Sequence, residues 1–165
     1  MIKRKTVPSQ RSKFQMNNKN QITSQEEFFM NIAIEEAQKG DFPFGAVIEK
    51  NGEILSKGHN LGIKLNDPTA HAEMMAIRNY TAHYPAENLM DATIYSTGEP
   101  CPMCAAALIW CGIGHIVYAS SIEELSSHIN QIMISCDTVL DSANFRKTKI
   151  TGGVLKNEAI RLFKK

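Results

Sequence analysis

The stretches His71-Ala-Glu73 and Pro100-Cys-Pro-Met-Cys104 decide the fold of this chain, and one predicted strand lies between them. Cysteines three residues apart on the first turn of a helix lie on the same side and can bind one metal ion. The unpaired backbone N–H groups of that turn favour the thiolate form that a metal requires. His71 brings the protein ligands to three, which leaves the fourth tetrahedral position for water, as in catalytic zinc sites. We therefore predict that His71, Cys101 and Cys104 bind one Zn²⁺.

Glu73 is predicted to be the catalytic proton shuttle rather than a fourth ligand. Residues two apart on a helix point in divergent directions, so a carboxylate there suits the water beside the metal better than the metal itself. Zinc lowers the pKa of a bound water to about 7, and the resulting hydroxide can attack an amino-bearing ring carbon. Glu73 would carry the proton to the ring nitrogen and help the amine leave as ammonia. The pattern H-x-E with P-C-x-x-C is the signature of zinc nucleobase deaminases.

The cysteine pair has other readings that its spacing does not exclude. A Cys-x-x-Cys pair after a strand and at the start of a helix also occurs as a redox dithiol, and as part of a structural zinc knuckle. Cys111 and Cys136 have no partner spacing and are expected to be small apolar residues. Because the chain has no signal-peptide pattern, its four cysteines do not predict disulfides.

Working outward from the two motifs, helices and strands alternate along the chain. Asn51-Gly52 fits a tight type I′ turn and predicts a hairpin, and Ser24-Gln-Glu-Glu27 has the form of a capping box. The predicted strands are 44–50, 53–58, 91–97, 115–119 and 149–151, and the predicted helices begin at Ser24 and span about 71–84, 101–111, 122–128 and 156–163. This alternation predicts an α/β sandwich around one central sheet.

Length and charge favour one domain with a separate leader. The 165 residues suit a single core. Residues 1–23 are polar, aperiodic and basic, so they predict a disordered leader, and residues 24–165 form the predicted domain. Residues 1–25 hold six bases and no acid, and the remaining 12 bases and 17 acids give the rest of the chain a net charge of −5. An acidic body disfavours a polyanion such as transfer RNA, although the basic leader keeps that partner open.

No apolar run reaches the length of a membrane span, and the first residues lack a signal peptide. The chain is therefore expected in the cytoplasm, without a membrane partner.

From about Phe44 to Tyr118 the chain resembles the cytidine deaminase superfamily, in the branch that holds bacterial guanine deaminases and tRNA adenosine deaminases. The matching stretches are Pro43-Phe-Gly-Ala-Val47, Gly58-His-Asn60, Asn66-Asp-Pro-Thr-Ala-His-Ala-Glu73 and Glu99-Pro-Cys-Pro-Met-Cys104. The resemblance implies a three-layer α/β/α sandwich around a central five-stranded mixed sheet, one zinc per subunit and a homodimer or larger assembly. It also implies that Asn60 hydrogen-bonds the bound base. The other residues expected to contact the base are Phe44, Ala72 and Trp110.

Three features bear on the substrate. By resemblance, tRNA deaminases typically place a histidine where Trp110 stands, and they carry a glycine- and lysine-bearing loop where this chain has Ser120-Ser-Ile-Glu-Glu-Leu125. Guanine deaminases usually have a Phe-Asp-Asp segment near the position of Ile129-Asn-Gln-Ile132. The resulting prediction is a hydrolytic deaminase of a free purine base or nucleoside, with guanine first. Deamination of adenosine to inosine in tRNA is the first alternative, and a metal-stabilised interaction domain without turnover is the second.

Overall fold

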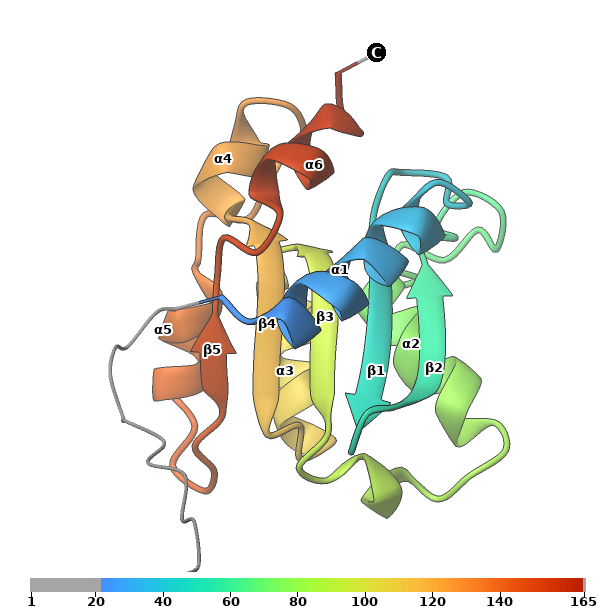
Figure 1. Ribbon diagram of the computed structural model, residues 1–165, viewed down its shortest axis with the longest axis vertical. Helices are drawn as coiled ribbons and strands as arrows, with labels where there is room; N and C mark the ends of the chain where they lie inside the picture. Colours follow the sequence, from blue (N-terminus) through green and yellow to red (C-terminus); the bar gives the residue numbers. More distant parts are fainter. Residues whose placement is uncertain (1–21, 165) are drawn as a thin grey trace, which may run out of the picture.

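The computed structural model describes residues 22–164, in which a sheet of five strands lies between two layers of helices (Figure 1). The strands are β1 (Gly45–Lys50), β2 (Glu53–His59), β3 (Thr93–Gly98), β4 (His115–Ser120) and β5 (Lys149–Thr151). The helices are α1 (Ser24–Ala37), α2 (Ala72–Thr81), α3 (Pro102–Trp110), α4 (Ile122–Ser126), α5 (Cys136–Asp141) and α6 (Lys156–Arg161), with a short 3-10 helix η1 at Ala86–Leu89. Residues 1–21 of the predicted basic leader lie outside the described residues.

The strand order is β2-β1-β3-β4-β5. β1 pairs antiparallel with both β2 and β3, whereas β3, β4 and β5 pair in parallel. The sheet is therefore mixed, as the resemblance implies. β2 and β3 run in the same direction because each is antiparallel to β1, so their carboxyl ends meet at one edge of the sheet.

Alternate residues of the strands supply two separate apolar cores. On one face Ala46, Ile94 and Ile116 pack beneath α2, α3 and α5. On the other face Val47 and Val117 pack beneath α1 and α6, and α1 crosses this face of the sheet in Figure 1. Both faces are covered by helices, which confirms the three-layer sandwich. No helix within residues 22–164 is long and apolar enough to span a membrane.

The predicted hairpin and first helix form with one adjustment. Asn51 and Gly52 both have positive φ, 55° and 84°, as a type I′ turn requires. The capping box, however, begins one residue earlier than the sequence suggested. Thr23 accepts from the Glu26 backbone N–H, and the Glu26 carboxylate accepts from the Thr23 backbone N–H at 2.8 Å. Thr23 and Ser24 can both cap a helix, and each is followed three residues later by a glutamate.

The structure adds α5 and η1 to the predicted elements. Each is at most six residues long. Cys136 begins α5 and is fully buried in the core against α3, as expected of an apolar filler.

His115, at the start of β4, makes the stability of the fold depend on pH. Its Nε2 lies 2.8 Å from Thr151 Oγ1. Burial and the nearby Lys149 charge lower the pKa of His115 to about 4, whereas an unfolded histidine has a pKa of about 6.5. Between these values the unfolded chain binds more protons than the folded chain, so stability falls as the pH falls from about 6.5 to 4.

The expected loss across that window is up to about 3 kcal/mol. Urea unfolding at several pH values measures it, and His115→Gln should flatten the pH dependence because its side chain does not titrate. His83 is exposed, so His83→Gln is the matched control and should behave like the unmodified protein. An unchanged slope in His115→Gln would contradict the assignment.

Candidate metal centre and substrate pocket

The two motifs meet because α2 and α3 both begin at the same edge of the sheet. His71 is the N-cap of α2, which follows the carboxyl end of β2 and the loop 60–70. Cys101 is the N-cap of α3, which follows the carboxyl end of β3. Ligands of open α/β sheets commonly bind outside the carboxyl ends of the strands. The topology therefore brings residues 30 positions apart to one site.

Gly58 allows the first turns of α2 to lie directly on β2. A Cβ atom at Gly58 would lie 2.3 Å from the Ala72 carbonyl oxygen and 2.3 Å from the Ala76 backbone nitrogen. No side chain fits in that space, so the glycine sets how closely the helix that carries Glu73 approaches the sheet.

The three predicted ligands lie together at distances that suit zinc. His71 Nδ1 is 3.6 Å from Cys101 Sγ and 3.7 Å from Cys104 Sγ, and all three ligand atoms lie within 4.8 Å of one another. Tetrahedral zinc with Zn–S bonds of about 2.3 Å and Zn–N bonds of about 2.05 Å separates nitrogen and sulfur by about 3.6 Å. The geometry therefore fits a tetrahedral zinc, and among residues 22–164 no fourth side chain joins the group.

The protonation of the three groups is coupled. A hydrogen bond from the Cys104 thiol, supported by His71, lowers the pKa of Cys101 to about 4. The same interaction raises the pKa of Cys104, and the hydrogen bond to Cys101 raises the pKa of His71. The cluster thus favours one thiolate and holds protons at the other positions. A divalent cation binds such a cluster by displacing those protons.

Glu73 lies beside this cluster in a buried position. Its side chain is 5% exposed, and Ser96 Oγ on β3 donates to Glu73 Oε1 at 3.0 Å. Burial raises the pKa of Glu73. A carboxyl group with a raised pKa holds a proton more readily than a free carboxyl group does, which favours the predicted role as a proton shuttle.

A cavity of ≈280 Å³ opens onto the cluster, near the lower end of the volumes of small-ligand sites. Its lining combines apolar and polar residues. The lining residues are Phe42, Phe44, Asn60, Gly62, Ile63, Pro68, His71, Glu73, Glu99, Cys101, Ile129, Asn130 and Gln131. Phe44 and Asn60 are thus at the cavity, where the sequence analysis expected contacts to a base. Ala72 is fully buried and does not belong to this lining.

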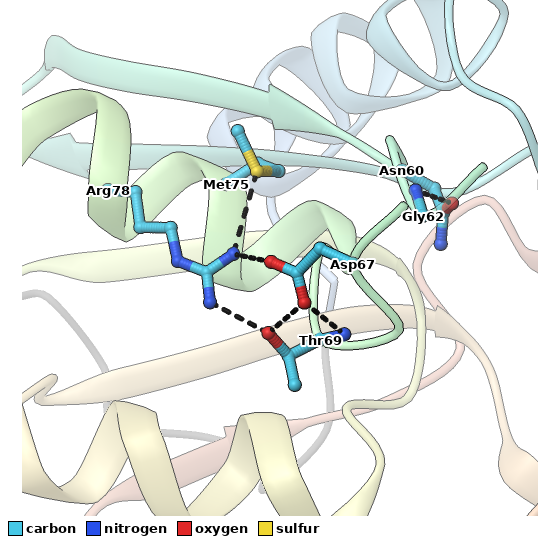
Figure 2. A network of polar contacts seen from close by, with 6 residues as sticks. All are labelled: Asn60, Gly62, Asp67, Thr69, Met75 and Arg78. Carbon is cyan, nitrogen blue, oxygen red and sulfur yellow. Dashed lines mark hydrogen bonds and ion pairs between the residues drawn. The ribbon is translucent and has the colours of Figure 1, made fainter. Parts of the chain in front are cut away.

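Asn60 is held by the loop that leads to His71 (Figure 2). Its Oδ1 accepts from the Gly62 backbone N–H at 3.1 Å, which leaves the side-chain amide N–H groups for a ligand. Further along the loop, Asp67 accepts from Thr69 Oγ1 at 2.6 Å and from Arg78 Nη1 at 3.0 Å. Arg78 belongs to α2, so this network ties the loop to the helix that carries Glu73.

The expectation for Trp110 is corrected by the structure. Trp110 is the last residue of α3, is 77% exposed and stacks on Phe145, with 4.9 Å between the ring centroids. It does not line the cavity. The physical reason is distance along the helix, because the six residues after Cys104 rise about 9 Å away from the metal end.

Several cavity residues had no role in the sequence analysis. Glu99 and Pro68 stand inside the quoted motifs, and their place beside the ligands was the available signal. Phe42 and Ile63 come from loops without a motif, so only the folded chain brings them to the cavity. Gln131 lies in the segment 129–132, which stands near the Phe-Asp-Asp position of guanine deaminases.

Comparison with known proteins agrees with this site. The family model for the cytidine and deoxycytidylate deaminase zinc-binding region matches residues 23–120. A protein of Streptococcus pyogenes serotype M18, named tRNA-specific adenosine deaminase, is 38% identical over 118 residues, 69% of this chain and 74% of the relative.

Two solved structures are also similar. One, from a study of A-to-I editing by tRNA:A34 deaminases at the wobble position, has a TM-score of 0.70 at 28% identity and covers 82% of this chain and 98% of its own. The guanine deaminase of Bacillus subtilis has a TM-score of 0.55 at 37% identity and covers 61% of this chain and 68% of its own.

Proposed function

The chain belongs to the cytidine and deoxycytidylate deaminase family, and we propose that within this family it is a zinc-dependent hydrolase that deaminates adenosine to inosine in transfer RNA. The observation that carries the proposal is the similarity to the streptococcal tRNA-specific adenosine deaminase, which extends over more than two thirds of both chains. The tRNA:A34 deaminase structure, at 28% identity, covers 82% of this chain and 98% of its own chain, which supports the same proposal.

The prediction of guanine or another free purine was therefore wrong. Sequence relatives that cover two thirds or more of this chain are named tRNA-specific adenosine deaminase. Two of the three features that disfavoured RNA lose their force in the structure, whereas the acidic net charge outside the basic leader stands. Trp110 lies far from the cavity. Ser121 to Glu124 form the capping box of α4, with Glu124 accepting from the Ser121 backbone N–H at 2.9 Å. Glu124 therefore has a structural role that says nothing about the substrate.

The polar groups of the cavity also favour adenine over guanine. Guanine carries N–H donors on its ring and its 2-amino group, which call for free acceptors such as carboxylates. Besides Glu73, the lining holds one carboxylate, Glu99, and both of its oxygens already accept backbone N–H groups. Asn60, Asn130 and Gln131 offer neutral amides, which can each donate and accept. Adenine, with one amino group and ring-nitrogen acceptors, matches such a lining.

The residues of the site have separate roles in the proposed reaction. His71, Cys101 and Cys104 hold the zinc, which supplies an activated water when it is bound. Ser96 Oγ donates to Glu73 Oε1, and the Glu73 carboxylate would accept one proton of the attacking water and pass it to the adjacent ring nitrogen. It would then accept the second proton, from the hydroxyl group that the water has become, and deliver it to the leaving amine, so that adenosine and water give inosine and ammonia. Asn60 and Phe44 hold the base, the first by hydrogen bonding and the second by contact with the ring. Assembly as a homodimer stays a prediction.

The proposal is tested with an anticodon stem-loop RNA that carries adenosine at the wobble position, using the full 165-residue chain. We expect one ammonia and one inosine per RNA. The control RNA carries guanosine at that position and should release no ammonia, and free guanine, adenine and adenosine should be turned over at least about 100-fold less efficiently. Turnover of free guanine without turnover of the RNA would contradict the proposal.

A further inference from the structure

Glu99 connects three parts of the structure from a buried position beside the metal ligands. It lies between β3 and Cys101 and is 8% exposed. Its Oε2 accepts from the Ile122 backbone N–H at 2.8 Å, and its Oε1 accepts from the Cys136 backbone N–H at 2.7 Å. Ile122 is the first residue of α4, and Cys136 is the first residue of α5. Both N–H groups belong to the first turn of a helix, where the backbone provides no acceptor for them.

The two helices enclose the segment that forms one wall of the cavity. Ile129, Asn130 and Gln131 lie between α4 and α5 and line the cavity. Within residues 22–164, the backbones of Asn130 and Gln131 make no hydrogen bond that would fix them locally. The position of this wall therefore depends on the two helices that flank it. The Ile129 N–H donates to the Leu125 carbonyl of α4, and Glu99 binds the first backbone N–H of α4 and of α5.

We infer that Glu99 is a positioning residue, which holds the wall 129–131 over the base-binding cavity by binding the first backbone N–H of α4 and of α5. It acts through the wall because both of its oxygens are occupied by these N–H groups. Its place directly before Pro100 and Cys101 fixes the wall relative to the metal ligands. The inference rests on the proposed function for the identity of the base, because the amides of Asn130 and Gln131 are the groups that the wall presents to it.

The test is the isosteric variant Glu99→Gln. Its amide oxygen can accept one of the two N–H groups, but its NH₂ faces the other, so one hydrogen bond to a charged group is lost. Such a bond contributes enough for a change of about tenfold or more. We expect amide hydrogen exchange at Ile122 or Cys136 to become at least about tenfold faster, with exchange in β3 unchanged. We expect the KM for the stem-loop RNA to rise about tenfold, with kcat within about threefold, because the wall contributes to binding.

Two further variants separate positioning from general destabilisation. Glu123 is an exposed residue of α4, so Glu123→Gln makes the same change of charge and should alter neither exchange nor KM. Replacing Asn130 and Gln131 by alanine together should raise KM without faster exchange at Ile122 and Cys136. When these changes are combined with Glu99→Gln, the rise in KM should be smaller than the product of the separate effects, because both act through one wall.

Three outcomes would overturn the inference: unchanged exchange at both amides of Glu99→Gln, a loss of bound zinc in that variant, or a fall in kcat with constant KM. The exchange measurement uses no substrate, so it tests the hydrogen bonds from Ile122 and Cys136 to Glu99 even if the RNA is not deaminated. In that case the proposed function fails, and KM is measured with whichever free base or nucleoside releases ammonia.

Discussion

Replacing Glu73 by alanine is expected to leave zinc bound and to lower kcat by about 10² to 10⁴-fold, the contribution typical of a general acid–base group. The three metal ligands form a complete set without Glu73, so the metal should remain. The reaction needs a group that moves a proton from water to the ring nitrogen and then to the amine. Within the described lining, Glu99 is the other carboxylate, and its oxygens are occupied.

Glu73→Gln is the matched variant for this prediction. It preserves the volume of the buried side chain and an acceptor for Ser96 Oγ, but it cannot carry the proton. It should therefore be as inactive as Glu73→Ala while keeping the melting temperature of the unmodified protein more closely. The measurements are zinc content per chain and single-turnover rates of inosine formation. A Glu73→Gln protein that retains more than about a tenth of the rate would remove Glu73 from the proton transfer.

Replacing Cys104 by alanine is expected to abolish both zinc binding and turnover. Cys104 is fully buried at the base of the cluster, where no water can take the place of the thiolate. Two remaining ligands give a far weaker site than three, and without zinc the activated water is absent. Zinc that binds only the folded chain raises its melting temperature. Cys104→Ala should therefore melt at a lower temperature than the unmodified protein, and the difference should grow as the zinc concentration is raised.

Cys111 provides the control for this loss. It is the C-cap of α3, at the opposite end of the helix from the cluster, and is partly buried. Cys111→Ala should keep one zinc per chain, keep its activity and respond to a chelator as the unmodified protein does. Cys104→Ala should show no further change on chelation. Equal zinc contents in the two variants would contradict the ligand assignment.

The metal cluster and the hairpin were predictable because their geometry is local. A helical first turn places residues three apart on one side, so the Cys101 and Cys104 pair can be recognised without the fold. The positive φ values at Asn51 and Gly52 are preferences of those two residues. The capping box shows the limit of such patterns, because Thr23 and Ser24 both fit the pattern and the structure has Thr23 as the cap.

The sequence by itself predicted the metal ligands, the shuttle Glu73 and the α/β class, from short motifs and from the alternation of helices and strands along the chain. By resemblance it also predicted Phe44 and Asn60, which line the cavity. Tertiary structure alone decided where Trp110 lies and which further residues line the cavity. Trp110 was expected to contact the base, but it is the last residue of α3. The first turn of α3, at the carboxyl edge of the sheet, is the end that faces the cavity, and only the fold shows this. Glu99 accepts from the backbone N–H groups of Ile122 and Cys136, which lie 23 and 37 positions further along the chain, on either side of the wall 129–131. Such contacts depend on how helices pack on a sheet, and no local period of the sequence records them.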